Sequence, residues 1–184
     1  KYGNADMVFE FASTSKVTLP GAGISCFACS EANMEYMCKL IGIQAISFDK
    51  MNQLRHVKFL QNKEHTLALM KEHAKILKPK FEMVVSTLER EIAPLGIASW
   101  QRPKGGYFVS LFAMPGTAKR VWTLCKEAGV VLTNAGATYP YRNDPEDSNL
   151  RIAPSLPPVA ELEKAMEVLC LSLRLSALEK LLAK

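Results

Sequence analysis

The stretch Ser13-Thr14-Ser15-Lys16-Val17-Thr18-Leu19-Pro20-Gly21-Ala22-Gly23 brings hydroxyl groups, a lysine and a glycine turn together between two apolar segments. The segment before it, Met-Val-Phe-Glu-Phe at 7–11, predicts a short and largely buried strand. The segment after it, at 24–28, predicts a second strand, and the Pro-Gly pair between them favours a turn with positive φ. We therefore expect two adjacent strands, with Lys16 just after the first.

Lys16 is the residue in this stretch with the clearest chemical potential. A lysine after a buried strand, beside Ser13 and Ser15, is expected to be desolvated and able to attack a carbonyl group. The hydroxyls and the backbone donors of the 21–23 turn suit a phosphate group. Together these features point to pyridoxal phosphate. A solvated turn without a ligand is the alternative, and the residues alone leave both open.

The composition describes a soluble globular chain. It has 184 residues, is 48% hydrophobic and 22% charged, and carries a formal net charge of +5. These values exclude collagen-like and extensively disordered proteins and allow one domain or two small ones. No apolar run approaches the roughly 18 residues of a membrane-spanning helix, and charges of both signs interleave, so neither a membrane nor a nucleic-acid partner is expected.

The five cysteines suggest a reducing compartment, and we expect a cytoplasmic protein. Cys26 and Cys29 have the spacing of a zinc-ligand pair, but no second pair stands at ligand distance, so no metal site is predicted. The chain begins without Met and inside a patterned segment, from which we expect a processed chain or a piece of a longer protein.

Helical periodicity dominates the chain, and short strands are confined to a few places. Pro79 lies inside the longest pattern and predicts a kink or break there. The sequence predicts helices at 31–43 with Ser30 as N-cap, after Asp49, at 64–92, at 117–128, and at 159–182 with Pro158 in the first position. Strands are predicted at 97–101 and 107–111 as an antiparallel pair, and at 130–133 and 149–153. The predicted fold class is α/β, with an α+β or α/β layer of helices packed on a small sheet after about residue 64.

Arg151 lies on a predicted strand among apolar neighbours, Leu150 and Ile152. On a strand its side chain points opposite to these neighbours, where the guanidinium group can bind a planar carboxylate through two hydrogen bonds. A structural ion pair with an acidic residue is the alternative.

Four segments resemble one enzyme family in order and spacing. The stretch at 13–23 resembles the Ser-x-Ser-Lys…Pro-Gly cofactor-lysine segment of fold-type I, class I/II aminotransferases. The segments Asp49-Lys50-Met51-Asn52-Gln53-Leu54-Arg55-His56, Pro103-Lys104-Gly105-Gly106-Tyr107-Phe108 and Asn149-Leu150-Arg151-Ile152-Ala153-Pro154 resemble the bacterial aspartate aminotransferase subgroup called type Ic. The resemblance spans essentially the whole chain and covers the C-terminal part of such an enzyme.

The resemblance implies a domain organisation and a function. Residues 1–45 would end the large domain that binds pyridoxal phosphate, 46–63 would form a connecting helical segment, and 64–184 would form most of the C-terminal small domain. The parent protein would be a homodimeric transaminase that exchanges an amino group between an amino acid, expected to be aspartate or another dicarboxylate, and a 2-oxo acid. The chain alone would be catalytically incomplete.

The resemblance also assigns roles to individual residues. Lys16 would form the internal aldimine and move the Cα proton of the substrate, Ser13 and Ser15 would bind the cofactor phosphate, and Arg151 would anchor the α-carboxylate. Gly23 is a departure, because many relatives have an arginine near this place.

Other roles and other functions stay open. Arg55 and Arg102 are candidates for the second cation that a dicarboxylic substrate requires, and His56 is given no catalytic role. A non-catalytic aminotransferase-like sensing domain of a transcriptional regulator is one alternative function. A lyase or racemase with the same cofactor is another.

Overall fold

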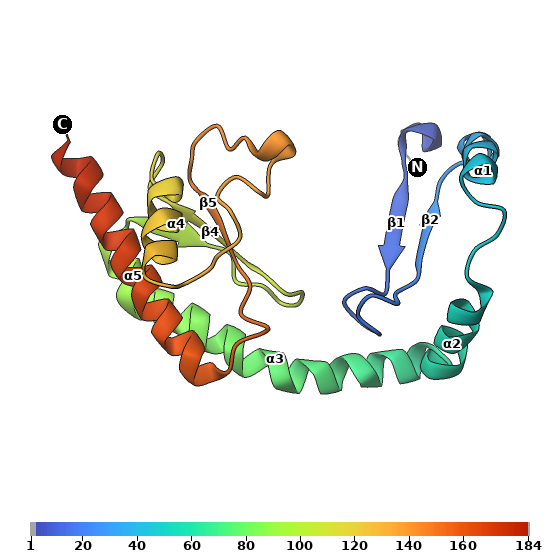
Figure 1. The fold of residues 1–184 in the computed structure, drawn as a ribbon, viewed down its shortest axis with the longest axis horizontal. Coiled ribbons are helices and arrows are strands. Elements are labelled where there is room, and N and C mark those ends of the chain that lie inside the picture. Colours follow the sequence, from blue (N-terminus) through green and yellow to red (C-terminus); the bar gives the residue numbers. More distant parts are fainter. Residues whose placement is uncertain (1–2, 184) are drawn as a thin grey trace. The chain divides into compact units, whose positions relative to one another are not determined.

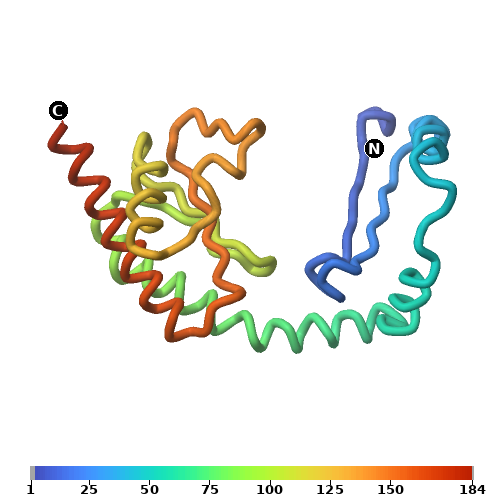
Figure 2. The backbone as a smooth tube through the Cα atoms, in the orientation of Figure 1, coloured from blue at the N-terminus to red at the C-terminus, as the bar shows by residue number. Residues whose placement is uncertain are grey.

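The computed structural model describes residues 3–183 and divides the chain into two compact units, Lys1–Glu72 and His73–Lys184 (Figures 1 and 2). The boundary lies within the long helix α3 (Lys63–Glu91). Each unit contains one antiparallel sheet with helices, in agreement with the prediction of helices packed on small sheets.

The first unit is built on a two-stranded sheet. Strand β1 (Glu10–Ser13) pairs antiparallel with β2 (Ser25–Ala28), in a register that places Ser13 opposite Ser25. A short 3-10 helix, η1 (Ala5–Met7), precedes β1, because the Asn4 side chain accepts a hydrogen bond from the backbone of Asp6. The first strand therefore begins later than the predicted 7–11, and it is exposed among the described residues rather than buried.

Two capped helices follow in the first unit. Helix α1 (Glu31–Gln44) begins after Ser30, whose side chain accepts from the backbone N–H of Asn33, as predicted. Helix α2 (Lys50–Leu60) begins after Asp49, whose side chain accepts from the backbone N–H of Asn52 at 2.9 Å.

The second unit is a three-stranded antiparallel sheet in the order β3-β4-β5, covered by helices. Its strands are β3 (Ala98–Trp100), β4 (Val109–Ala113) and β5 (Asn149–Ile152), its helices are α4 (Ala118–Glu127) and α5 (Val159–Leu182), and two 3-10 helices, η2 (Ala93–Leu95) and η3 (Pro140–Arg142), lie in the connections. The core is formed by apolar residues that recur at helical spacing on α3, α4 and α5 and by alternate residues of the strands. It includes Val84, Leu88, Val109, Leu111, Val121, Leu150, Ile152, Leu162, Met166, Leu169 and Leu173.

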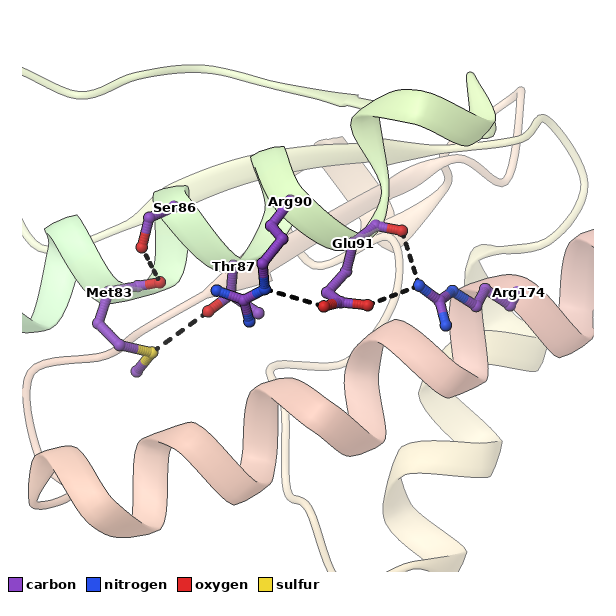
Figure 3. Close-up of polar contacts among 6 residues, drawn as sticks. All are labelled: Met83, Ser86, Thr87, Arg90, Glu91 and Arg174. Carbon is purple, nitrogen blue, oxygen red and sulfur yellow. Dashed lines mark hydrogen bonds and ion pairs between the residues drawn. The ribbon is translucent and has the colours of Figure 1, made fainter.

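Polar contacts join α5 to the end of α3 (Figure 3). Arg174 donates to the backbone oxygen of Glu91 at 2.9 Å and to its carboxylate at 2.7 Å, while Arg90 binds the other carboxylate oxygen at 2.9 Å. The hydrogen bonds from Arg90 and Arg174 lower the pKa of the Glu91 carboxyl group. These contacts fix the direction in which α5 crosses α3.

Two predictions about prolines differ from the structure. The sequence predicts a kink or a break at Pro79, and the break does not occur, because α3 is continuous through Pro79. The next residue, Lys80, donates to the backbone oxygen of Ser155, between β5 and α5, at 2.7 Å. Pro158 is the N-cap of α5 rather than its first residue.

The predicted strand at 130–133 is absent from the described structure. Its backbone groups bond to α4 instead: the N–H of Val130 donates to Cys125 at 2.8 Å, and the indole N–H of Trp122 donates to Leu132 at 3.3 Å.

Candidate functional site

The loop from Thr14 to Ile24 carries Lys16 and connects β1 to β2. The backbone N–H groups of Val17 and Thr18 both donate to the carbonyl oxygen of Thr14 at 2.9 Å, so Lys16 lies within a single tight turn directly after β1. Farther along the loop, Ala22 donates to Leu19 at 3.1 Å. This turn needs the positive φ of Gly21, which is +74°.

The structure brings Ser13 and Ser15 together immediately before Lys16. Their hydroxyl oxygens are 2.6 Å apart, and the backbone N–H of Ser15 points to the Ser13 oxygen at 3.1 Å. Both serines and Lys16 are exposed among the described residues, so the predicted burial of the lysine does not hold here. The three residues of the predicted cofactor site therefore lie close together along the chain and are exposed to solvent.

Gly23 shows why this loop has no side chain at the position where the resemblance expects an arginine. A Cβ atom built on Gly23 would lie 3.2 Å from the Cα, the backbone nitrogen and the hydroxyl oxygen of Ser15. The two backbone segments approach closely enough that a side chain at position 23 would require Ser15 to shift by a few tenths of an ångström.

These residues fit the phosphate end of pyridoxal phosphate. Ser13 and Ser15 supply hydroxyl donors that can rotate toward an anion, and Gly23 leaves the backbone uncovered beside them. Lys16 adds a positive charge and an amine at the neighbouring position. A phosphate group bound here would meet these hydroxyl groups and the lysine rather than an arginine of the loop.

Arg151 lies in the second unit, on β5, opposite Ser110 of β4. Its neighbours Leu150 and Ile152 are buried in the core, so the alternation of the strand directs Arg151 to the other face. Its Cζ atom lies 4.4 Å from the centre of the Phe108 ring, a cation–π arrangement that holds the guanidinium plane.

The hydrogen-bonding capacity of Arg151 is largely unused within residues 3–183. Nη2 makes one long contact, 3.5 Å to the Thr133 hydroxyl, and the buried Nε atom has no partner there. No acidic side chain in the described part of the chain forms an ion pair with Arg151. This arrangement favours an external anion over the structural ion pair that the sequence left open.

The two candidates for a second cation have ordinary surroundings. Arg102 forms an ion pair with Glu89 at 2.9 Å, and both the Arg102 side chain and Arg55 on α2 are exposed.

Asp144 is a residue whose importance sequence reasoning missed. It is buried and accepts backbone hydrogen bonds from Glu146 at 3.1 Å and from Ser148 and Asn149 at 2.8 Å each. Burial raises the pKa of Asp144, but the N–H groups of Asn149, Ser148, Glu146 and Asp147 outweigh it and bring this pKa below its ordinary value. Asp144 thus fixes the loop that leads into β5 and Arg151.

His56 is a second such residue. It is 2% exposed, the only buried side chain among the described residues 3–72. Its Nε2 atom lies 2.8 Å from the hydroxyl of Thr18, two residues beyond Lys16. The one relevant feature of the sequence is that His56 follows Asn52 by one helical turn, and Asn52 also contacts the 14–24 loop.

The chain resembles proteins of one kind along its whole length. The sequence profile of the family described as "Aspartate amino-transferase" matches residues 1–184. An aspartate aminotransferase of Corynebacterium glutamicum is 48% identical over 177 residues, which cover 96% of this chain and 41% of that protein. The chain therefore spans less than half the length of this curated relative.

Solved structures show the same fold. The crystal structure of an aspartate transaminase from Corynebacterium glutamicum superposes with a TM-score of 0.88 at 48% identity, covering 94% of this chain and 41% of that chain. The α-aminoadipate aminotransferase of Thermus thermophilus, solved in complex with N-(5'-phosphopyridoxyl)-L-leucine, superposes with a TM-score of 0.74 at 18% identity, covering 92% of this chain and 42% of that chain.

Proposed function

Because the chain belongs to the aspartate aminotransferase family, we propose that it supplies the cofactor lysine and the carboxylate-binding arginine of a pyridoxal-phosphate-dependent transaminase. The full-length protein would transfer an amino group between aspartate and a 2-oxo acid. The observation that carries the proposal is the pair of serine hydroxyls, 2.6 Å apart, on the turn that presents Lys16.

The proposed division of labour follows from the chemistry of each group. Pyridoxal phosphate, when bound, supplies an electron sink for the negative charge left when the Cα proton of the amino acid departs. Ser13 and Ser15 would hold the phosphate. The Lys16 amine would take the proton from Cα of the amino acid in one half of the exchange and deliver a proton to Cα of the new amino acid in the other half. Arg151 orients the substrate through two parallel hydrogen bonds to its α-carboxylate.

The proposed domain organisation places these residues in two parts of one enzyme. Residues 1–45 end the large cofactor-binding domain, 46–63 connect the domains, and 64–184 form the small domain. In support, Lys16 and Arg151 lie in different compact units. The full-length protein is proposed to act as a homodimer in the cytoplasm. Within residues 3–183, no helix is long and apolar enough to span a membrane.

Lys16 can be tested directly by chemical trapping. The full-length polypeptide that carries this sequence is incubated with pyridoxal phosphate, reduced with borohydride and digested, and the modified peptide is identified by mass spectrometry. We expect the label on Lys16 and no label at this peptide in a Lys16→Ala variant. A Lys58→Ala variant, which removes an exposed lysine of α2, should keep the label.

The reaction is tested separately, by supplying aspartate and 2-oxoglutarate and measuring glutamate. Glutamate formation that depends on Lys16 supports transamination. Labelling of Lys16 without glutamate would retain the cofactor and overturn the proposed reaction.

A further inference from the structure

The loop that carries Lys16 is closed at its base by one residue. The backbone N–H of Thr14 donates to the carbonyl oxygen of Ile24 at 2.9 Å, and the N–H of Ile24 donates to the Thr14 hydroxyl at 2.9 Å. Thr14 thereby ties the two ends of the loop together. Because Thr14 also accepts the backbone bonds that form the Lys16 turn, a displacement of Thr14 would displace Lys16.

His56 contacts this loop from helix α2. Its Nδ1 atom lies 2.9 Å from the carbonyl oxygen of Asn52, and its Nε2 atom lies 2.8 Å from the Thr18 hydroxyl and 3.4 Å from the Thr14 hydroxyl. A carbonyl oxygen only accepts hydrogen bonds, so Nδ1 carries a proton. In the neutral ring, Nε2 then accepts a hydrogen bond from a threonine hydroxyl.

Asn52 contacts the far side of the same loop. Its side-chain nitrogen donates to the carbonyl oxygen of Ala22 at 2.9 Å, beyond the Pro-Gly turn. Asn52 and His56 are one helical turn apart, so both side chains lie on one face of α2. The helix thus holds the loop on both sides of Lys16, at Thr18 and at Ala22.

From these contacts we infer that His56, together with Asn52, is a positioning residue that holds the 14–24 loop so that Lys16 and Ser15 keep their places toward the cofactor. The inference rests on the proposed function of Lys16 and adds a residue that acts through Thr18 and Thr14. A lysine side chain is long and flexible, so a fixed backbone turn reduces the entropy lost when its amine is held at one point. His56 fixes that turn without touching the reacting atoms.

The test compares polar and apolar residues at the same position in the full-length protein. His56→Leu removes both ring nitrogens, whereas His56→Gln keeps a polar group that can reach Thr18. His65→Leu is the matched control, because His65 lies exposed on α3. Thr18→Val removes the hydroxyl group that contacts His56. If His56→Leu fails to fold, Thr18→Val is the variant that tests the same contact.

Two readouts separate a positioning role from a general loss of stability. The first is amide hydrogen exchange of residues 14–24 in the cofactor-free protein, which we expect His56→Leu and Thr18→Val to accelerate by about fivefold or more relative to the rest of the chain. The second is the visible absorption band of bound pyridoxal phosphate and the rate at which the cofactor dissociates. His56→Gln should give values close to those of the wild-type protein in both readouts. The double variant His56→Leu/Thr18→Val should differ from the wild-type protein by little more than the more strongly affected of the two single variants does.

Each outcome decides the inference. Unchanged exchange of the loop in both His56→Leu and Thr18→Val would overturn it, as would additive effects in the double variant or a failure of His56→Gln to restore the absorption band. If borohydride does not label Lys16 in the wild-type protein, the proposed function fails, and hydrogen exchange still decides whether His56 holds the loop.

Discussion

Arg151 is held by contacts that leave its hydrogen-bonding edge available. The Phe108 ring packs against the guanidinium group at 4.4 Å, and the Nε atom is buried without a partner among the described residues. A planar carboxylate with two oxygen atoms would satisfy this edge, whereas a lysine ammonium would not reproduce its geometry.

At Arg151 we therefore expect even a charge-preserving substitution to be harmful. Arg151→Lys should lower kcat/KM for the amino acid by about tenfold to a hundredfold, because two charge-assisted hydrogen bonds are replaced by a point charge. Steady-state kinetics of the full-length protein measure this, with cofactor absorbance as a check on the site. Arg102→Gln should change kcat/KM little, since Arg102 pairs with Glu89 at the surface. If Arg102→Gln lowered kcat/KM as much as Arg151→Lys does, the substrate α-carboxylate would not be bound specifically by Arg151.

At the scale of elements, the periodicity of apolar residues predicted the helices well. It predicted less well which strands form and whether they are buried. The recurrence of apolar residues and the caps at Ser30 and Asp49 predicted α1 and α2, since both signals are local. The segment at 130–133 has the composition of a strand, but it directly follows α4 and its backbone groups bond to Cys125 and Trp122 of that helix. Contacts with the end of the helix therefore replace the pairing that a strand would need.

The candidate site divides in the same way. The order of motifs predicts roles for Ser13, Ser15, Lys16 and Arg151, because their chemistry shows in residue type, and these roles stay predictions. The contacts of His56 and Asp144 could not be predicted from sequence, since they arise from burial and from groups that only the folded chain brings to them.

The loop before β5 depends on the charge of Asp144, which leads to a prediction about pH. The folded-state pKa of Asp144 lies below the unfolded value of about 3.9, so its stabilisation is complete above that value and is lost as pH falls through the folded pKa. Asp144→Asn should reduce the free energy of unfolding of the second unit by about 1–3 kcal/mol near neutral pH.

Urea unfolding at neutral pH and at about pH 3 measures this effect. The difference between wild type and Asp144→Asn should shrink at the lower pH, while the exposed control Glu146→Gln should resemble wild type at both. A difference that stays constant with pH would show that the charge of Asp144 is not what holds the loop.

At the scale of the whole molecule, the two units differ in how they bury side chains. Among described residues, His56 is the buried side chain of 3–72, whereas the second unit has a continuous apolar core. The cysteines follow this difference: Cys26 and Cys38 are exposed, and Cys125 and Cys170 are buried. Burial raises the pKa of the Cys125 thiol and raises that of Cys170 to about 11.

Thiol alkylation of the 184-residue chain should therefore map the two units. Iodoacetamide reacts with thiolates, so Cys26 and Cys38 should be modified rapidly near neutral pH, and Cys125 and Cys170 only after unfolding in denaturant. Mass spectrometry of timed samples distinguishes these sites. Equal rates at Cys26 and Cys170 under native conditions would contradict the buried core of the second unit.

The close approach of Gly23 to Ser15 constrains how this chain can change by mutation. An arginine at position 23 would add a cation near the phosphate site, but its Cβ atom would meet the Ser15 backbone at 3.2 Å. The new charge and the crowding of Ser15 would come with the same substitution. Its net effect on the proposed phosphate site would therefore depend on neighbouring residues that let Ser15 shift by a few tenths of an ångström, which is a case of epistasis.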